Sequence, residues 1–257
     1  MTGCHPSTRH VSHRWAMSFL TEIRYSVGSI AARAVEFALP VACAGCYHPG
    51  TTLCRDCRTA LKVRLAAGSG EHWGSAAAVP GVHQLEWCGR YDGMTRRVLD
   101  RLSCDGERHM SEPLGTAIAS RWVVTGMGGE ALVPVPASPD RVREIGYDHT
   151  LELARVAGRR LGLSVTEALL HGTAGVPTRS SEPAGPRPQA GRAFEVNAAS
   201  RITGRSVVLV DDVVVSGATL ATCAAALLAA GARMVSAITV ARDQAGTSKM
   251  PEGTADH

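Results

Sequence analysis

Apolar residues follow a clear pattern in the second half of the chain. From residue 130 onward, continuous apolar runs at 131–136, 206–210 and 234–240 predict short buried strands. Residues 150–161 and 218–230 carry apolar side chains at helical spacing. A strand, a helix and a strand at this distance form a right-handed parallel crossover unit. We therefore expect an α/β domain in which a parallel sheet is flanked by helices.

The pattern before residue 130 is weaker. Residues 82–87 alternate as in a strand, whereas residues 58–65 and 95–102 have helical spacing. Residues 27–43 place apolar side chains on one face, which predicts an amphipathic helix that Pro40 ends.

Composition predicts the boundaries between these segments. Residues 66–70 form a linker, because small residues fill them. Residues 171–191, with Arg179 and Arg187 among them, are rich in Pro, Gly, Ser and Arg and have no apolar period. Inside a compact domain such a stretch is either a functional lid or a disordered segment. The expected division is a helix with a four-cysteine module at 17–65, a second domain at 76–242, and disordered tails at 1–16 and 243–257.

The overall composition fits this architecture. Hydrophobic residues make up 45% of the chain and aromatic residues only 4%, so the core must consist mainly of Ala, Val and Leu. Helices packed on a buried parallel sheet have such a composition, whereas a β-sandwich does not. A formal net charge of +4 suits a small anionic ligand and does not require nucleic acid.

We expect the chain to remain in the cytoplasm without membrane insertion. No uninterrupted apolar run reaches the roughly 18 residues that a transmembrane helix needs. Arg33 and Glu36 interrupt the best candidate for a secretion signal, which lies at 27–43. Closely paired cysteines also favour a reducing compartment.

Four of the eight cysteines form two close pairs. Cys43 and Cys46 form one C-x-x-C turn, and Cys54 and Cys57 form a second. Each turn presents two thiolates to one ion, so the two turns together predict a tetrahedral zinc site that is closed and structural. His48 lies between the pairs and is either a competing ligand or, as is more common for a lone histidine, a solvent-facing side chain. On spacing alone, two disulfides, a redox dithiol and an iron–sulfur cluster remain alternatives.

Basic residues follow the second cysteine pair. Zinc ribbons often support the binding of nucleic acids or protein partners, which makes Arg55, Arg58, Lys62 and Arg64 relevant. No aromatic residues are interleaved with them, so we interpret them as the solvated face of a helix.

The carboxylates Asp211 and Asp212 are adjacent at the end of the apolar run 206–210. Open α/β sheets bind their ligands at the carboxyl ends of their strands. The pair therefore offers hydrogen-bond acceptors, for instance for sugar hydroxyls, at a position where ligands bind. The alternative is that both side chains are surface charges between a strand and a helix.

A turn of small residues, 216–219, follows the acid pair and opens the next helix. Successive backbone N–H groups of such a turn converge on an anion, and the hydroxyls of Ser216 and Thr219 add donors. Gly217 permits close approach of a ligand or a positive φ angle. Ordinary helix capping favours the same residue types, so a capped helix without a ligand is the competing interpretation.

Arg141 and Arg143 follow the proline turn at 134–136. At the end of a strand they are able to donate bidentate hydrogen bonds to a diphosphate. Otherwise they are surface charges on a loop.

The segment 208–219 resembles the phosphoribosyl diphosphate (PRPP) motif of type I phosphoribosyltransferases, which has two acids, two apolar residues and then Thr-Thr-Gly-x-Thr. In that family the acids hold the ribose 2′- and 3′-hydroxyls and the loop holds the 5′-phosphate. The resemblance implies that Asp211 and Asp212 are the catalytic pair, although Val215 replaces the first threonine. The residues that it assigns to PRPP binding are Asp211, Asp212, Val213, Ser216, Gly217, Ala218 and Thr219, together with Arg141 and Arg143.

More widely, residues 40–242 resemble the ComF family, a type I phosphoribosyltransferase-like family with an N-terminal zinc ribbon. The segments that match are the cysteine module, Tyr91-Asp92-Gly93, residues 132–136, the arginine-rich segment 141–149, Ala193-Phe194 and residues 239–242. The arginine-rich segment of the family normally ends Arg-Gly-Phe-Asn-Gln.

This sequence departs from the family at several positions. Ile145 replaces an arginine, Asp148 and His149 replace the Asn-Gln pair, and Ser103 stands where a lysine is usual. The family has a lid pattern with Gln and Asn residues before Ala193-Phe194. This pattern is largely absent here, and Gln189 is its nearest remnant. Binding of PRPP is therefore a firmer expectation than its turnover.

The resemblance implies two functions. The first is Mg²⁺-dependent transfer of 5-phosphoribose to an unidentified acceptor with loss of pyrophosphate, the ion arriving on the diphosphate. The second, which the departures favour, is non-catalytic: a PRPP sensor, or an accessory protein of competence and DNA uptake that contacts single-stranded DNA or another competence protein. From the cysteines alone, a redox or metal-storage protein is a third hypothesis.

Overall fold

The computed structural model describes residues 41–66, 79–172, 194–197 and 201–243. Apart from residues at their edges, the expected helix at 27–43, the linker at 66–70, the segment 171–191 and both tails lie outside the described residues. The chain divides at Arg58 into two compact units, each of which we describe by itself.

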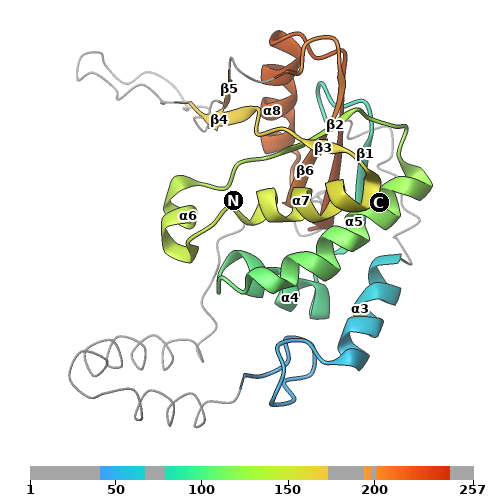
Figure 1. The fold of residues 1–257 in the computed structure, drawn as a ribbon, viewed down its shortest axis with the longest axis vertical. Helices are drawn as coiled ribbons and strands as arrows, with labels where there is room; N and C mark the ends of the chain where they lie inside the picture. The colour runs from blue at the N-terminus through green and yellow to red at the C-terminus, as the bar shows by residue number, and fades with distance from the viewer. Residues whose placement is uncertain (1–40, 67–78, 173–193, 198–200, 244–257) are drawn as a thin grey trace, which may run out of the picture. The chain divides into compact units, whose positions relative to one another are not determined.

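A five-stranded parallel sheet forms the centre of the second unit, as the apolar runs predict. Its strands lie in the order β1-β7-β6-β2-β3, and every neighbouring pair is parallel. Because neighbouring strands are parallel, the chain has to cross a face of the sheet between them, and helices form most of these crossovers (Figure 1). The bounds are β1 Leu85–Arg90, β2 Ala131–Pro134, β3 Ser164–Val165, β6 Ser206–Val214 and β7 Met234–Arg242.

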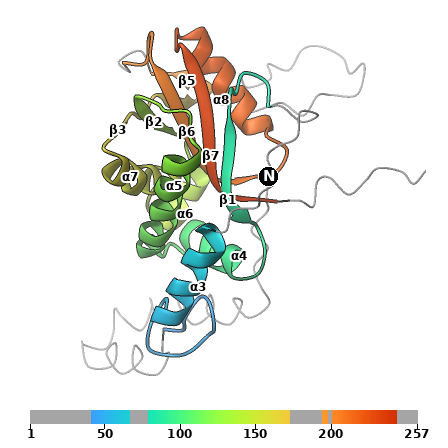
Figure 2. The ribbon, with the colours of Figure 1, turned by 90° about the vertical axis from the view of Figure 1, so that its right-hand side faces the viewer.

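Helices cover both faces of this sheet. The helices α5 (Ser111–Thr125) and α7 (His149–Leu161) pack against each other on one face, and α8 (Ala218–Ala229) lies on the other (Figure 2). This confirms the expected architecture of a parallel sheet flanked by helices. The remaining elements are α3 (Arg55–Ala66), α4 (Gly93–Ser103), η2 (Arg108–Met110), α6 (Pro139–Ile145) and an antiparallel hairpin of β4 (Leu169–His171) and β5 (Phe194–Val196).

The core contains mainly aliphatic side chains, as the low aromatic content requires. Val208, Leu209 and Val210 in the central strand β6 are each 0% exposed. The helix α8 packs Leu220 and Leu227 onto the same side of the sheet as Leu209. Burial of these side chains from water on both faces explains why β6 has an apolar run without alternation.

Several elements differ from their predicted bounds. The strand β6 extends to Val214 and therefore includes the acid pair, whereas β2 ends at Pro134, two residues earlier than expected. The apolar pattern did not predict α5 or the hairpin of β4 and β5, because both have short or mixed apolar sequences. Arg141 and Arg143 lie in the helix α6 and not on a loop, as the alternative interpretation of them as surface charges supposed.

None of the helices in the described part of the chain combines the length and the apolar character that crossing a membrane would take.

Candidate functional site

The acid pair lies where the strand β6 loses a neighbour. The last register pair between β2 and β6 joins Pro134 to Val210, and the N–H of Val135 donates to the carbonyl of Val210 (2.9 Å). Asp211 and Asp212 come directly after this position, while β7 still pairs with β6 on the other side. The early end of β2 thus places the two carboxylates at the carboxyl edge of the sheet, near its centre.

Each aspartate also caps the backbone next to it. The N–H of Asp212 donates to Oδ1 of Asp211 (2.9 Å), and the N–H of Val213 donates to Oδ1 of Asp212 (2.7 Å). One oxygen of each carboxylate is therefore used within the strand. Oδ2 of Asp211 and the remaining lone pairs of Asp212 stay available as acceptors, since a carboxylate accepts up to about four hydrogen bonds.

The two acids have opposite electrostatic surroundings. Asp211 is only 9% exposed, and burial together with the negative charge of Asp212 raises its pKa well above the ordinary value. Burial also raises the pKa of Asp212, but a hydrogen bond from His149 and the charge on that imidazole outweigh it and hold the pKa below the usual range. The pair is therefore expected to share one proton that resides mainly on Asp211.

The turn after β6 has the features of an anion-binding loop. Gly217 precedes α8 with φ +77°, and a Cβ atom on it would lie 2.5 Å from Cγ2 of Val79. A side chain at this position is thus excluded by both conformation and space. Ser216 and Thr219 are exposed, and Oγ of Ser216 accepts from the N–H of Ala218 (3.3 Å).

Backbone donors of this turn are available. Within the part of the chain that the structure describes, no hydrogen bond occupies the N–H groups of Val215, Ser216 or Gly217. The first N–H groups of α8 also lack intrahelical acceptors. The segment therefore presents several free donors a few residues after two carboxylate acceptors.

The loop after β2 is fastened to the start of α7. Oδ2 of Asp148 accepts from the N–H of Ala137 (2.9 Å), and its Oδ1 accepts from the N–H of Leu151 (3.0 Å), which caps the helix. The hydroxyl of Thr150 donates to the carbonyl of Val135 (2.5 Å). These bonds fix the loop that follows β2 beside the first turn of α7.

His149 joins the start of α7 to the acid pair. Its Nε2 lies 3.2 Å from Oδ2 of Asp212, and its side chain is 9% exposed. The sequence analysis assigned no functional role to this residue. The signal that was present is the replacement of the family's Asn-Gln pair by Asp148 and His149, and both replacements make tertiary contacts here.

The structure separates the two arginines that were assigned to PRPP binding. Arg141 is close enough to His149 for its charge to affect the pKa of the imidazole, although its guanidinium also pairs with Glu144 (2.9 Å). Arg143 is 75% exposed and pairs with the exposed Asp140 on its own helix. The charge of Arg141 thus reaches His149, which contacts the acid pair, whereas no contact connects Arg143 to the pair within the described residues.

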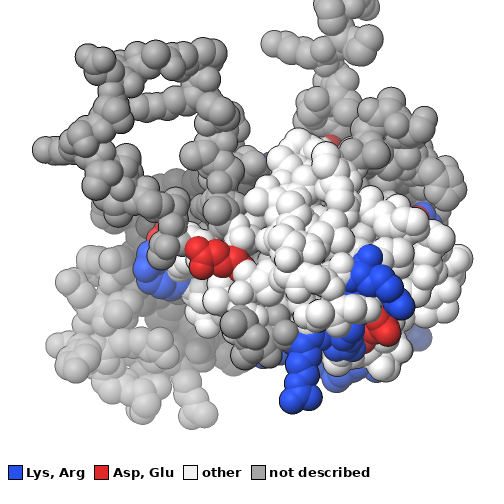
Figure 3. Space-filling model, turned by 90° about the horizontal axis from the view of Figure 1, so that it is seen from above, with Lys and Arg blue, Asp and Glu red and all other residues white. Residues whose placement is uncertain are grey.

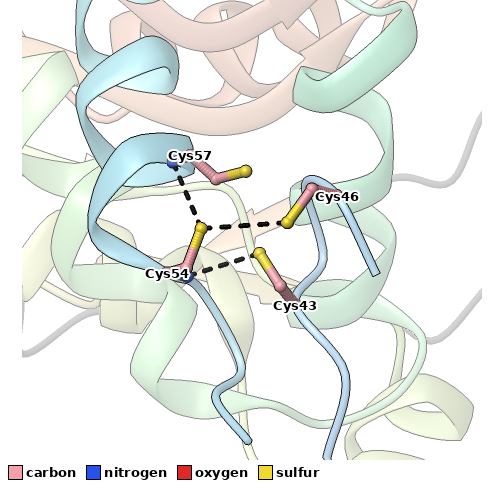
Figure 4. A group of neighbouring side chains, drawn as sticks. All are labelled: Cys43, Cys46, Cys54 and Cys57. Atoms are coloured by element: carbon pink, nitrogen blue, oxygen red, sulfur yellow. Dashed lines mark hydrogen bonds between the residues drawn. The ribbon is translucent and has the colours of Figure 1, made fainter. Parts of the chain in front are cut away.

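The first unit brings the four cysteines together. The sulfur atoms of Cys43, Cys46, Cys54 and Cys57 all lie within 4.8 Å of one another, and those of Cys46 and Cys54 are 3.8 Å apart (Figure 4). Four sulfurs at about 2.3 Å from one zinc ion would lie about 3.8 Å apart. All four are free thiols. The cluster thus fits a metal ion such as zinc, with only small adjustments.

Backbone groups prepare this cluster for negative charge. The N–H groups of Gly45 and Cys54 each donate to Sγ of Cys43 (both 3.3 Å). Burial raises the pKa of this thiol, but the backbone hydrogen bonds outweigh it and lower the pKa to about 6. Tyr47 holds the left-handed conformation (φ +64°) that closes the first C-x-x-C turn. His48 is not part of the cluster, and its carbonyl accepts from the N–H of Cys43 (2.9 Å).

The comparison with family models agrees with this fold. Residues 158–254 match the family model described as the phosphoribosyl transferase domain, a range that includes the acid pair and the turn after it. A search among curated proteins found no match. Among solved structures, the chain is similar to an allosteric regulatory enzyme of purine biosynthesis, with 19% identity and a TM-score of 0.35 over 50% of this chain.

The similarity covers only part of each protein. The match spans 25% of the length of that enzyme's chain. The family match likewise leaves the cysteine cluster and residues 141–149 outside its range. The chain thus combines a phosphoribosyltransferase-like α/β domain with a four-cysteine cluster that is able to hold a metal ion.

Proposed function

We propose that this protein binds PRPP, or a related ribose 5-phosphate ligand, at the carboxyl end of β6. One observation carries the proposal: two carboxylates and a turn with free backbone N–H groups follow each other on the central strand. Asp211 and Asp212 accept hydrogen bonds from the ribose hydroxyls, and residues 216–219 donate to the 5′-phosphate. The match to the phosphoribosyl transferase domain over 158–254 supports the same assignment.

In the transfer reaction that this ligand permits, the bond between ribose C1 and pyrophosphate breaks and a bond from C1 to an acceptor forms. Mg²⁺ accompanies the diphosphate, since phosphate oxygens supply many of its ligands in such sites. Arg141 is the arginine that we assign to the diphosphate, because Arg143 lies at the surface with Asp140. Binding without transfer is the alternative outcome, and the departures from the ComF pattern at 145, 148 and 149 favour it.

Isothermal titration with PRPP, with and without Mg²⁺, tests the binding. We expect saturable binding by the wild type and a loss of at least about tenfold in affinity for Asp211→Ala, which removes both oxygens that accept from the ribose. Asp105→Ala, which changes an acid between α4 and η2, is the control and should bind as the wild type does. Absence of binding by the wild type would overturn the proposal.

Turnover is tested separately. Wild-type protein with PRPP, Mg²⁺ and a panel of nucleobases releases pyrophosphate if the protein is a transferase. Binding without any release would assign it to the non-catalytic class. Asp211→Ala provides the background rate.

We propose that the four cysteines of the first unit hold a zinc ion. Four thiolates fill all the positions of a tetrahedral ion, so the metal has a structural role. Thiols that lie together without forming a disulfide suit a reducing compartment, for which we propose the cytoplasm.

A role in DNA uptake, which the ComF resemblance implies, requires a basic surface. Arg64 is engaged with Asp92 and with the hydroxyl of Thr95 (3.1 Å), which leaves fewer free cations on that part of α3. On the face shown in Figure 3, basic side chains lie at the lower right and at the left, in both places beside acidic ones, and uncharged residues cover most of the other surface that is described. We therefore favour a small phosphorylated ligand over single-stranded DNA or a competence-machinery partner.

A further inference from the structure

His149 stands out because it is buried, able to carry charge and bonded to a ligand-binding acid. It is the first residue of α7, and its Nε2 lies 3.2 Å from Oδ2 of Asp212. Its Nδ1 is buried and has no hydrogen-bond partner among the described residues. Asp212 thus fixes a proton on Nε2, while no donor holds Nδ1 in its unprotonated state. Nδ1 is thus an open site for a second proton, which the charge of Asp212 favours and the burial of an N–H without an acceptor opposes.

The neighbouring acid lacks such a partner. Asp211 is 9% exposed, and no lysine, arginine or histidine pairs with it within the described residues. Its Oδ1 accepts only the N–H of Asp212 (2.9 Å). Two adjacent buried carboxylates do not both ionise readily, because their charges repel each other at low dielectric. A cation on one of them decides which one ionises.

We propose that His149 is a positioning residue for the sugar: as an imidazolium it holds Asp212 ionised and fixed in orientation, so that Asp212 accepts from a ribose hydroxyl while Asp211 keeps the shared proton. This inference rests on the proposed function and deepens it. A glutamine, which the ComF pattern has at this position, donates a hydrogen bond but supplies no charge. The sugar-binding affinity of this protein therefore depends on pH through His149.

Three charged groups act on the imidazole. Burial lowers the pKa of His149, but the hydrogen bond and the charge of Asp212 on β6 raise it, and the net shift is upward. Asp148, the cap of α7, adds to the rise, and Arg141 on α6 opposes it. Below the raised pKa His149 is charged and Asp212 is held, and as the pH rises through that pKa the charge is lost.

A ligand-free measurement tests the pairing. In a histidine-labelled sample, the imidazole signals of His149 are followed by NMR from pH 5 to pH 9. We expect a midpoint above the ordinary value of about 6.5 in the wild type, and a lower midpoint in Asp212→Asn, which keeps the shape of the side chain but not its charge. An unchanged midpoint in Asp212→Asn would overturn the proposal, even if variants of His149 failed to fold.

Titration with ribose 5-phosphate at pH 6.5 and pH 8.5 tests the consequence. Between these pH values the wild type should lose about five- to tenfold more affinity than His149→Gln, since a charge-assisted hydrogen bond is weakened only in the wild type. Ionisation of the ligand phosphate, with a pKa of about 6, affects both proteins equally. His83→Gln, at an exposed histidine, should behave as the wild type does.

The outcomes separate the two proposals. Ribose 5-phosphate binding with the same pH dependence in wild type and His149→Gln would overturn the role of His149 and leave the proposed function intact. Lack of binding by the wild type at both pH values would overturn the proposed function and the role of His149 with it.

Discussion

At the scale of single residues, Gly217 supports the phosphate turn through its backbone. Its positive φ was foreseeable, because a small-residue turn before a helix favours glycine, whereas the 2.5 Å approach of a Cβ atom to Val79 follows from the fold. The contact with Val79 was not foreseeable, since residues so far apart in sequence meet only in the folded chain.

Gly217→Ala should therefore both destabilise the protein and weaken the binding of phosphorylated ligands. Strain at a positive φ costs about 1–3 kcal/mol, and the clash with Val79 adds to it. Gly204→Ala is a matched control: Gly204 has φ +73° and open space around its Cβ position. Urea unfolding should show a larger loss for Gly217→Ala, and equal losses would contradict the steric argument.

Asp211 is a residue whose carboxyl group costs stability when it is ionised. Its pKa lies well above the usual range because of burial and the charge of Asp212, so the folded state binds its proton more tightly than the unfolded state does. The resulting stabilisation is complete below the unfolded pKa of about 3.9 and is lost as the pH rises through the raised folded pKa.

Asp211→Asn removes this titration. Its free energy of unfolding should exceed that of the wild type by at least about 1 kcal/mol at pH 9, with a smaller difference at pH 5. Thermal unfolding at both pH values measures this. Asp140→Asn, at a residue that is 84% exposed, should show no such pH-dependent gain. If Asp211→Asn were less stable than the wild type at pH 9, this would contradict the assignment of the shared proton to Asp211.

Sequence reasoning reached the acid pair and the turn but not His149 or the separation of the arginines. The pair and the turn form one local segment, so their spacing alone suggested a site. The bond between His149 and Asp212 joins α7 to β6 across 63 positions of sequence. The outward direction of Arg143 follows from its place on α6, a helix too short for its apolar pattern to predict.

At the scale of elements, the sheet and the helices adjoining it were predictable, whereas α5 was not. Continuous apolar runs mark strands that are buried on both faces, as β6 and β7 are. The buried face of α5 includes Ser111 and Gly115, which carry no hydrophobic signal. Gly115 is buried because α7 lies close to it: a Cβ atom would lie 2.6 Å from Cβ of Val156.

Replacing Gly115 with alanine should force α5 and α7 apart. Overpacking of this kind costs about 1–3 kcal/mol, although alanine is the better helix former by about 1 kcal/mol. Ser120→Ala, on the exposed side of the same helix, is the control and should be neutral or slightly stabilising. Denaturant unfolding checks both variants, and a stabilised Gly115→Ala would show that the helices separate at no cost.

At the scale of the whole molecule, two units of different construction share the chain. The second has a hydrophobic core, while the described part of the first contains few buried apolar side chains besides its cysteines. A small unit of this kind is expected to depend on its metal for stability. The spacing of the cysteines predicted their convergence, because each C-x-x-C turn brings its own two thiols together.

Purified protein should contain about one zinc ion per chain. Cys46→Ser should lose most of the metal, because three thiolates remain for four positions, whereas Cys223→Ala in α8 should retain it. Elemental mass spectrometry after extensive dialysis measures both. Iron instead of zinc would favour a cluster, and full zinc occupancy in Cys46→Ser would contradict the assigned ligands.

The central claim is that the acid pair on β6 recognises the hydroxyls of a phosphorylated ribose. Isothermal titration with ribose 5-phosphate and with 2-deoxyribose 5-phosphate, under identical conditions, tests it most directly. The deoxy sugar leaves one carboxylate of Asp211 or Asp212 without its partner, so we expect it to bind at least about tenfold more weakly. Equal affinity for the two sugars would contradict the claim, since binding would then depend on the phosphate alone.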